Sequence, residues 1–164
     1  MRKMMYSETL CTPIGKIQVQ ASETALVRVT RLQDDAMEEH VPNAVTDLAV
    51  AQIREYFAGT RRVFTVPVAF HGTPFQCAVW RELQRIPFGC TVSYRELGER
   101  MGRPAASRAI GGAVGKNPLL ILVPCHRVIR ADGGLGGFSA GLDAKIVLLE
   151  REGVTGFRIG EAGK

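Results

Sequence analysis

The sequence predicts an α+β fold in which a small N-terminal α/β lobe, residues 1–70, precedes a helical C-terminal lobe, residues 71–164. β-branched and alternating segments gather in the first part of the chain, whereas helix-start signals and apolar residues at helical spacing dominate the second. A hydrophobic content of 46% and a charged content of 23% are typical of globular proteins. A disordered or fibrous chain is therefore excluded.

A small sheet and one helix are predicted for the N-terminal lobe. Residues 16–21 and 26–30 alternate in polarity or are β-branched, which is typical of strands, and residues 62–70 form a third β-rich segment. Thr46 or Asp47 is expected to cap a helix between the second and third segments. The apolar face of that helix is expected to hold Ala49, Ile53 and Phe57.

Two helix-start motifs open the C-terminal lobe. Thr73, Pro74 and Gln76 combine a capping hydroxyl, a proline at the first helical position and a glutamine three residues beyond the cap. Ser93 and Glu96 form a second capping box, which predicts another short helix. The first of these helices is expected to bury an apolar stripe made of Phe75, Val79, Leu83 and Ile86.

A short turn at Gly102 and Arg103 separates the second of these helices from a third, expected over residues 104–116. The surrounding window, residues 81–130, holds nine Lys or Arg against three Glu, a local charge of 9 − 3 = +6. Two helices joined by so short a turn in a basic window favour a helix-turn-helix that binds DNA. An ordinary helical hairpin is the alternative.

An apolar segment followed by a thiol marks the candidate reactive site. Residues 119–123 are apolar, and Cys125 and His126 follow after a proline. Pairing with an imidazole or with nearby cations would lower the pKa of the thiol and favour the nucleophilic thiolate. Because neighbours in an extended chain point to opposite sides, this pairing requires a local turn or a bridging water. Glu152 ends a helix expected over residues 143–152, where it either orients the imidazole or is an ordinary surface glutamate.

Three motifs occur in a fixed order: RAIGGA at residues 108–113, VPCHRV at 123–128 and GFSAGL at 137–142. Together they resemble the O6-alkylguanine-DNA alkyltransferases, also called methylated-DNA–protein-cysteine methyltransferases. The resemblance implies a ribonuclease-H-like N-terminal lobe and a winged-helix-like C-terminal lobe with a helix-turn-helix. It also implies a DNA repair reaction in which the alkyl group of O6-alkylguanine, or less readily of O4-methylthymine, moves irreversibly to Cys125, so that each molecule acts once.

The same resemblance implies roles for individual residues. His126 would take the thiol proton through a water, and Glu152 would orient the imidazole. Arg108 would fill the space left by a base flipped out of the duplex, and Tyr94 would contact that base. Phe138 replaces a frequent tyrosine and Ala140 a frequent glycine, which leaves the tolerance for bulky O6 groups open. The small Ala106, Ser107 and Ala109 would let their helix lie in the minor groove. The Ser139 amide and the backbone at Cys125 and Val128 would hold the guanine edge, Phe138 is counted among the base contacts, and Asn117 would brace the turn before the thiol.

Charge and position alone add Arg95 and Arg103 as phosphate contacts. The four cysteines show no CxxC spacing, so we expect free thiols, no metal and no cofactor. We expect no membrane segment, a cytoplasmic and nucleoid-associated location, and a monomer whose cooperativity on DNA is left open. Two other functions are weighed: a DNA-binding protein that senses the lesion without repairing it, and a Cys-His hydrolase that turns over many times.

Overall fold

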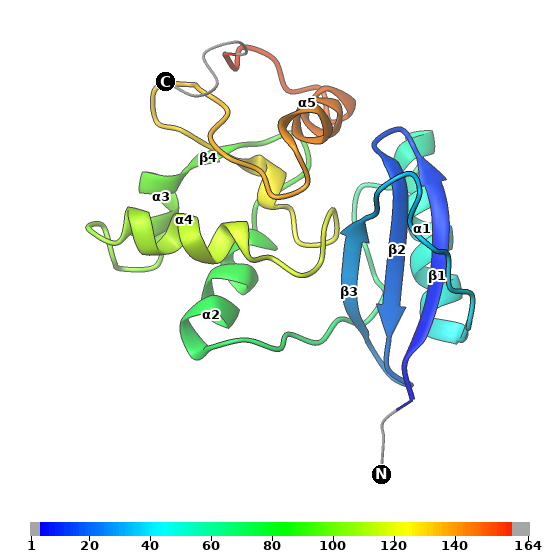
Figure 1. Cartoon of the computed structure of the whole chain (residues 1–164). Helices are drawn as coiled ribbons and strands as arrows, with labels where there is room; N and C mark the ends of the chain where they lie inside the picture. Colours follow the sequence, from blue (N-terminus) through cyan, green and yellow to red (C-terminus); the bar gives the residue numbers. More distant parts are fainter. Residues whose placement is uncertain (1–3, 159–164) are drawn as a thin grey trace. The chain divides into compact units, whose positions relative to one another are not determined.

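The computed structural model describes residues 4–158 and divides the chain into two compact units (Figure 1). The first unit runs to His71 and also contains Pro118–Leu120; the second contains Gly72–Asn117 and the chain from Ile121 onward. The short segment 118–120 bonds to the backbone of Val29. Val29 N–H donates to Pro118 O at 2.8 Å, and Leu120 N–H donates to Val29 O at 3.2 Å.

A three-stranded antiparallel sheet and one helix build the first unit. The strands are β1 (Tyr6–Thr12), β2 (Gly15–Ala21) and β3 (Leu26–Arg31), in the order β1-β2-β3. Helix α1 (Ala44–Ala58) packs on one face of this sheet (Figure 1). Along β2 every second side chain is buried, namely Ile17, Val19 and Ala21. This alternation confirms the two predicted strands and adds β1, which the pattern did not indicate.

Helix α1 starts earlier than the sequence predicts. Its N-cap is Asn43, whose side chain accepts a hydrogen bond from Thr46 N–H at 2.9 Å, while Asn43 N–H donates to Thr46 Oγ1 at 2.9 Å. The prediction of a cap at Thr46 or Asp47 was therefore wrong, because Thr46 completes the capping box from inside the first turn. The buried face contains Ala49, Ile53 and Tyr56, whereas Phe57 is half-buried.

The β-rich segment at residues 62–70 is not a strand. Only one bridge links it to the sheet, where Leu26 N–H donates to Pro67 O at 2.8 Å and Ala69 N–H donates to Leu26 O at 3.0 Å. Just before this bridge, the N–H groups of Thr65 and Val66 donate to the Gln52 side chain at 2.9 and 3.2 Å instead of to another strand. Pro67 supplies no N–H at all, so a ladder cannot extend through this segment.

Both predicted capping boxes are present in the second unit. Helix α2 (Pro74–Leu83) is capped by Thr73 with Gln76, and helix α3 (Tyr94–Arg100) is capped by Ser93 with Glu96. Helix α2 ends at Leu83, and Ile86 is buried in the turn that follows. These side-chain caps satisfy backbone N–H groups that a helix start leaves without partners, which explains why the sequence located both starts.

Helix α3 is joined to helix α4 (Ser107–Gly115) by the predicted tight turn. Gly102 adopts φ +69°, its N–H donates to Glu99 O at 3.0 Å, and Arg103 N–H donates to Gly98 O at 2.8 Å, a Schellman motif that stops α3. The prediction that Pro104 begins the next helix was wrong. Residues 103–106 form their own turn, with Ala106 N–H donating to Arg103 O at 3.0 Å, and α4 begins after it.

The rest of the second unit holds the segment that carries the cysteine. Strand β4 (Val92–Ser93) pairs in parallel with β5 (Val128–Ile129), which directly follows the 3-10 turn η1 (Cys125–Arg127). Helix α5 (Leu142–Arg151) closes this unit and contacts η1. No helix within residues 4–158 is long and apolar enough to cross a membrane.

Candidate active site

The 3-10 turn η1 brings Cys125 and His126 into one buried cluster. Cys125 N–H donates to Val123 O at 2.8 Å and Arg127 N–H donates to Pro124 O at 3.0 Å, so the chain coils where the preceding residues are extended and apolar. Every residue from Leu119 to Val128 is buried. The local turn that a cysteine–histidine pair requires is therefore present.

Burial raises the pKa of the Cys125 thiol above its ordinary value. A hydrogen bond with the Asn117 side chain, the positive charge of Lys145 and the backbone N–H groups of Cys125 and His126 act in the opposite direction without overcoming burial. Burial thus opposes the thiolate form that pairing with an imidazole or with cations would favour, so a proton acceptor near the sulfur is needed to form the nucleophile.

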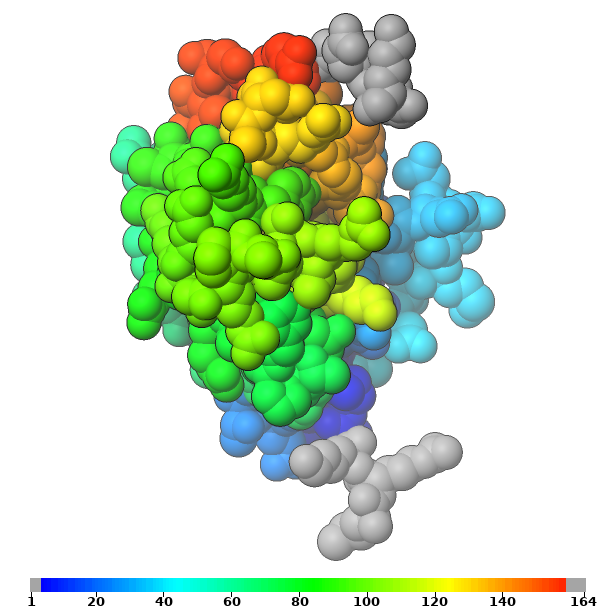
Figure 2. All heavy atoms as spheres, turned by 90° about the vertical axis from the view of Figure 1, so that its left-hand side faces the viewer, coloured from blue at the N-terminus to red at the C-terminus, as the bar shows by residue number. Residues whose placement is uncertain are grey.

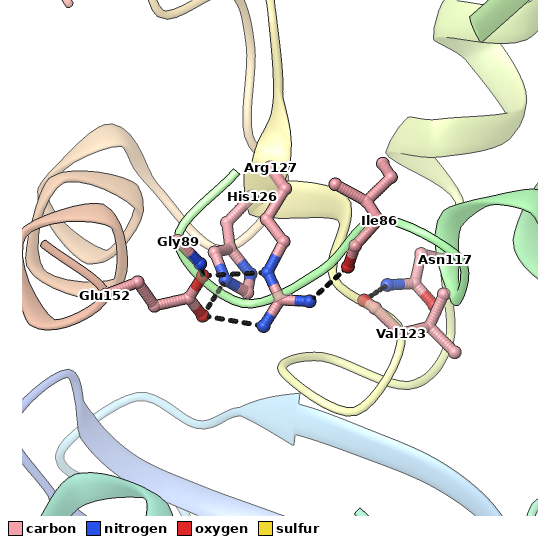
Figure 3. Close-up of polar contacts among 7 residues, drawn as sticks. All are labelled: Ile86, Gly89, Asn117, Val123, His126, Arg127 and Glu152. Atoms are coloured by element: carbon pink, nitrogen blue, oxygen red, sulfur yellow. Dashed lines mark hydrogen bonds and ion pairs between the residues drawn. The ribbon is translucent and has the colours of Figure 1, made fainter. Parts of the chain in front are cut away.

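Glu152 lies at the centre of a buried polar network (Figure 3). The His126 Nε2 atom is 2.7 Å from Glu152 Oε2, and Arg127 donates to both carboxylate oxygens, from Nε at 2.7 Å and from a terminal nitrogen at 3.0 Å. Gly89 N–H approaches Oε1 at 3.4 Å. These donors offset the unfavourable interaction between the carboxylate and the C-terminal end of the helix dipole. Glu152 is therefore not an ordinary surface glutamate.

This network fixes the tautomer of His126. A buried guanidinium keeps its charge, so Glu152 beside it is a carboxylate and can only accept, which places the imidazole proton on Nε2. The other nitrogen, Nδ1, is buried and has no hydrogen-bond partner among the described residues. Burial lowers the pKa of His126 below its ordinary value, although the hydrogen bond to Glu152 acts in the opposite direction. The arrangement supplies a neutral base next to the cysteine in the chain.

Lys145 ties the glycine-rich loop, residues 132–141, to β5. Its buried ammonium donates to Val128 O at 2.7 Å, to Leu135 O, and to Gly137 O at 3.2 Å, and it lies 5.8 Å from the centre of the Phe138 ring. Burial lowers the pKa of Lys145 to about 8, and the nearby Cys125 acts in the opposite direction. A single side chain therefore positions the loop and places positive charge near the sulfur.

A pocket of about 480 Å³ opens between helices α3 and α4 and the glycine-rich loop. It is mostly apolar and is lined by Tyr94, Gly111, Val114, Gly115, Gly137, Phe138 and Ser139. Burial and the neighbouring Cys125 both raise the pKa of Tyr94, so its hydroxyl stays protonated close to the sulfur. The structure thus brings the predicted Tyr94, Phe138 and Ser139 together in a pocket of the size that binds small ligands.

The other predicted contacts lie outside this lining. Ala106 and the exposed Ser107, Arg108 and Ala109 follow one another at the start of α4, and α3 and α4 cover much of the face of their unit seen in Figure 2. Asn117 donates to Val123 O at 2.8 Å and so braces the turn before the cysteine. Val128 is buried in β5 with its carbonyl bound to Lys145.

Arg95 and Arg103 are both exposed. Arg95 is 3.5 Å from Glu99 in the next turn of α3, and the Arg103 guanidinium lies 5.4 Å from the centre of the Phe75 ring. Arg103 lies in the predicted turn between α3 and α4. Neither side chain lines the pocket.

Sequence reasoning missed Arg127 and Lys145. Arg127 stands in the reactive motif without an assigned role, and only the folded chain shows that it bonds to a residue 25 positions away. Lys145 carried a readable signal. It falls on the same helical face as Leu148, Leu149 and Glu152, at spacings of three, four and seven residues, and a charge inside such a stripe indicates a buried, paired group.

Two family models match the chain. The ribonuclease-like domain of 6-O-methylguanine DNA methyltransferase matches residues 5–70, and the DNA-binding domain of the same family matches residues 74–154. A methylated-DNA–protein-cysteine methyltransferase of Methanosarcina acetivorans is 41% identical over 155 residues, which cover 91% of this chain and 99% of that protein. An inducible one from Bacillus subtilis is 50% identical over 101 residues, 62% of this chain and 56% of that protein.

Solved structures agree with these matches. The Mycobacterium tuberculosis O6-methylguanine methyltransferase is similar with a TM-score of 0.81 and 39% identity, covering 91% of this chain and 93% of that chain. The two-domain fold and the buried cysteine turn define a DNA repair alkyltransferase. The chain belongs to the methylated-DNA–protein-cysteine methyltransferase family, which confirms the predicted family and fold class.

Proposed function

We propose that this protein repairs DNA by transferring the alkyl group of O6-alkylguanine, mainly O6-methylguanine and to a lesser extent O4-methylthymine, to Cys125. The observation that carries the proposal is a buried thiol followed by a neutral imidazole, close to a tyrosine that lines a pocket beside a helix-turn-helix. A Mycobacterium tuberculosis relative, OGT, is known in complex with DNA; it has a TM-score of 0.81 and 39% identity and covers 89% of this chain and 91% of that chain.

In the proposed reaction the Cys125 sulfur attacks the alkyl carbon in line with its bond to O6. A carbon–sulfur bond forms, the carbon–oxygen bond breaks, and its electrons remain with guanine, which takes up a proton. His126 Nδ1 accepts the thiol proton through a water, and Glu152 holds the imidazole by its other nitrogen. A thiolate is a poor leaving group from an alkyl thioether, so the alkyl group stays on Cys125 and the protein acts once.

The substrate must leave the duplex, because a stacked base cannot reach a buried sulfur. Arg108 is the large exposed side chain among the small residues that start α4, which suits insertion into the vacated stack from the minor groove. Tyr94 would contact the flipped base from the pocket wall. The small Ala106, Ser107 and Ala109 would allow close approach to the DNA backbone.

The remaining residues are assigned supporting roles. The Ser139 amide and the backbone at Cys125 and Val128 would bind the guanine edge, and Phe138 would cover its ring. Asn117 would hold the sulfur and the turn before it. Arg95 and Arg103 would contact phosphates. We further propose that the protein acts as a monomer in the cytoplasm, where a bacterial or archaeal chromosome lies.

Mass spectrometry of the reacted protein tests this function. The protein is incubated with a duplex oligonucleotide containing O6-methylguanine, digested, and its peptides are weighed. We expect one added methyl group on the Cys125 peptide and exhaustion of activity after one equivalent, with no change in the Cys125→Ser variant. Binding without a gain in mass would instead support a lesion sensor, and continued turnover would support a hydrolase.

A further inference from the structure

Arg127 is a buried arginine in the turn η1, and the proposed reaction assigns it no role. Its Nε and one terminal nitrogen donate to Glu152 at 2.7 and 3.0 Å, and its other terminal nitrogen donates to Ile86 O at 2.6 Å (Figure 3). The guanidinium also lies 5.9 Å from the centre of the Phe88 ring. Every guanidinium nitrogen is therefore bonded, and the side chain has one fixed position.

The Glu152 carboxylate is shared between Arg127 and His126. Oxygen Oε2 accepts from both His126 Nε2, at 2.7 Å, and Arg127, at 3.0 Å, while Oε1 accepts from Arg127 at 2.7 Å. The carboxylate side chain is wholly buried, so water does not screen these charges. Arg127 and Glu152 thus form a neutral pair, and His126 bonds to a carboxylate whose charge is already balanced.

The net charge of this buried cluster determines whether the His126 imidazole is protonated. With Arg127 present, a proton on His126 Nδ1 would add a net positive charge to a buried cluster that also faces the Lys145 ammonium. With a neutral side chain at position 127, the Glu152 carboxylate would lose the balancing charge of the guanidinium, and an imidazolium at His126 would be favoured. The charged and titratable groups around His126 are Glu152 and Lys145 from α5, and Cys125 and Arg127 from η1.

We propose that Arg127 is a positioning residue that keeps His126 neutral in the resting protein, so that Nδ1 is free to receive the Cys125 proton. Arg127 does not touch the reacting atoms; it acts through Glu152. A protonated His126 could not accept the thiol proton. The imidazolium would first have to lose its Nδ1 proton before the thiol could react. The charge state of His126 does not depend on the proposed function, whereas the consequence for proton transfer rests on it.

An NMR titration of the imidazoles in the full-length, unreacted protein tests the charge state. The chain has three histidines, and the signals of the exposed His40 and His71 serve as internal references. In Arg127→Gln, the pKa of His126 should rise by about one pH unit or more. Arg130→Gln, which removes an exposed arginine three positions on, should leave His126 unchanged.

Arg127→Lys covers the case in which Arg127→Gln does not fold. A lysine keeps the charge but loses the two-pronged bond, so His126 should shift in the same direction by a smaller amount. A second readout is the pH dependence of transfer from free O6-benzylguanine, whose acid limb should move to higher pH together with the His126 titration.

The outcomes separate the two proposals. An unchanged His126 titration in a folded Arg127→Gln or Arg127→Lys variant would overturn the role of Arg127 and reduce the pair to a structural ion pair. The NMR measurement needs no alkyl transfer, so it remains decisive even if the protein carried out no repair. Conversely, a shifted titration with no methyl group ever found on Cys125 would support Arg127 and refute the repair function.

Discussion

The Cys125 thiol is protected by the same burial that positions it. Each unit by which a thiol pKa exceeds the pH lowers the thiolate fraction about tenfold, so a buried sulfur reacts slowly with general reagents. In this protein the buried Cys125 is surrounded by an amide, an ammonium and backbone N–H groups that can stabilise the thiolate once the proton has an acceptor. In the proposed mechanism, selectivity therefore depends on the proton relay through His126, because burial opposes a permanently ionised sulfur.

Thiol labelling measures this protection directly. At neutral pH we expect iodoacetamide to modify the exposed Cys11 and Cys90 well before Cys125, followed by peptide mass spectrometry. Because burial raises the pKa of Cys125, its labelling should accelerate only above the pH range of an ordinary thiol. Cys77, which is also buried, is the control. Faster labelling of Cys125 than of Cys90 at neutral pH would contradict the assignment.

Arg108 should matter for duplex DNA and little for a free base. We expect Arg108→Ala to slow repair of O6-methylguanine in duplex DNA at least about tenfold, since a stacking deficit of a few kcal/mol is left uncompensated, while transfer from free O6-benzylguanine changes little. Arg54→Ala removes the same charge from an exposed position on α1 and should affect neither reaction. Equal losses on both substrates would refute the stacking role.

At the residue scale the sequence located what lies in motifs and missed what depends on packing. Cys125 and His126 are adjacent in the chain, and Glu152 stood out because a carboxylate ends a helix. Arg127 could not be assigned, because its partners Glu152 and Ile86 are 25 and 41 positions away. The raised pKa of Cys125 follows from burial by neighbours that the sequence does not specify.

Among the elements, the glycine-rich loop sets the width of the pocket. Gly136 adopts φ +71°, and a Cβ atom there would lie 3.0 Å from the Tyr94 ring and hydroxyl. A side chain at position 136 would thus both strain the backbone and displace Tyr94, which lines the pocket. Gly133, in the same loop, also has a positive φ, +88°, but has open space where a Cβ would lie and does not line the pocket.

This contrast gives a matched pair of variants. Gly136→Ala should lower the rate of transfer from the bulky O6-benzylguanine more than the rate for O6-methylguanine in DNA, by about tenfold or more for the larger group, because the pocket narrows against it. Gly133→Ala, which brings a comparable backbone strain without contacting Tyr94 or lining the pocket, should leave the ratio of the two rates near that of the unmodified protein. The transfer rates from both substrates are measured for each variant. An unchanged ratio in Gly136→Ala would show that Tyr94 does not limit the width of the pocket.

Elements with local signals were predicted correctly, and those that depend on a distant partner were not. The capping boxes at Thr73 and Ser93 are formed within four residues, so the sequence contains all of their parts. Strand β1 contains mostly polar residues and shows no alternation, yet it pairs fully with β2. Residues 62–70 show the opposite error: they have strand-like composition, but the Gln52 side chain occupies the N–H groups of Thr65 and Val66.

Over the whole molecule, the net charge of +5 is unevenly distributed, with the excess between residues 81 and 130. A protein that neutralises DNA phosphates releases counterions, so its affinity falls with salt, with a log–log slope of about −0.9 per phosphate contacted. We expect this behaviour for undamaged duplex DNA, measured by fluorescence anisotropy over a salt series.

The same series tests the two arginines assigned from charge. Arg95→Ala and Arg103→Ala should each reduce the magnitude of the slope by about one, because each removes one phosphate contact. Arg54→Ala, exposed on α1, should leave the slope unchanged although it lowers the net charge equally. A slope unaffected by either of the first two changes would remove that residue from the DNA contact surface.

The pattern along the chain separates a strand-rich part from a helical part, but it gives no sign that the segment 118–120 pairs with β3. Three apolar residues shortly before Cys125 fit the core of either unit equally well. The backbone bonds of Val29 with Pro118 and Leu120 decide the question, and they form only when two segments some 90 positions apart meet.

That short pairing means the lobes are not interchangeable modules. A gene fragment starting at residue 72 would encode the reactive turn yet leave Leu119 and Leu120 with no strand to dock on. Such a fragment would expose these apolar residues to solvent and would tend to self-associate. Recombination that shuffles whole domains would therefore have to keep both halves together or re-engineer the stretch leading to the cysteine.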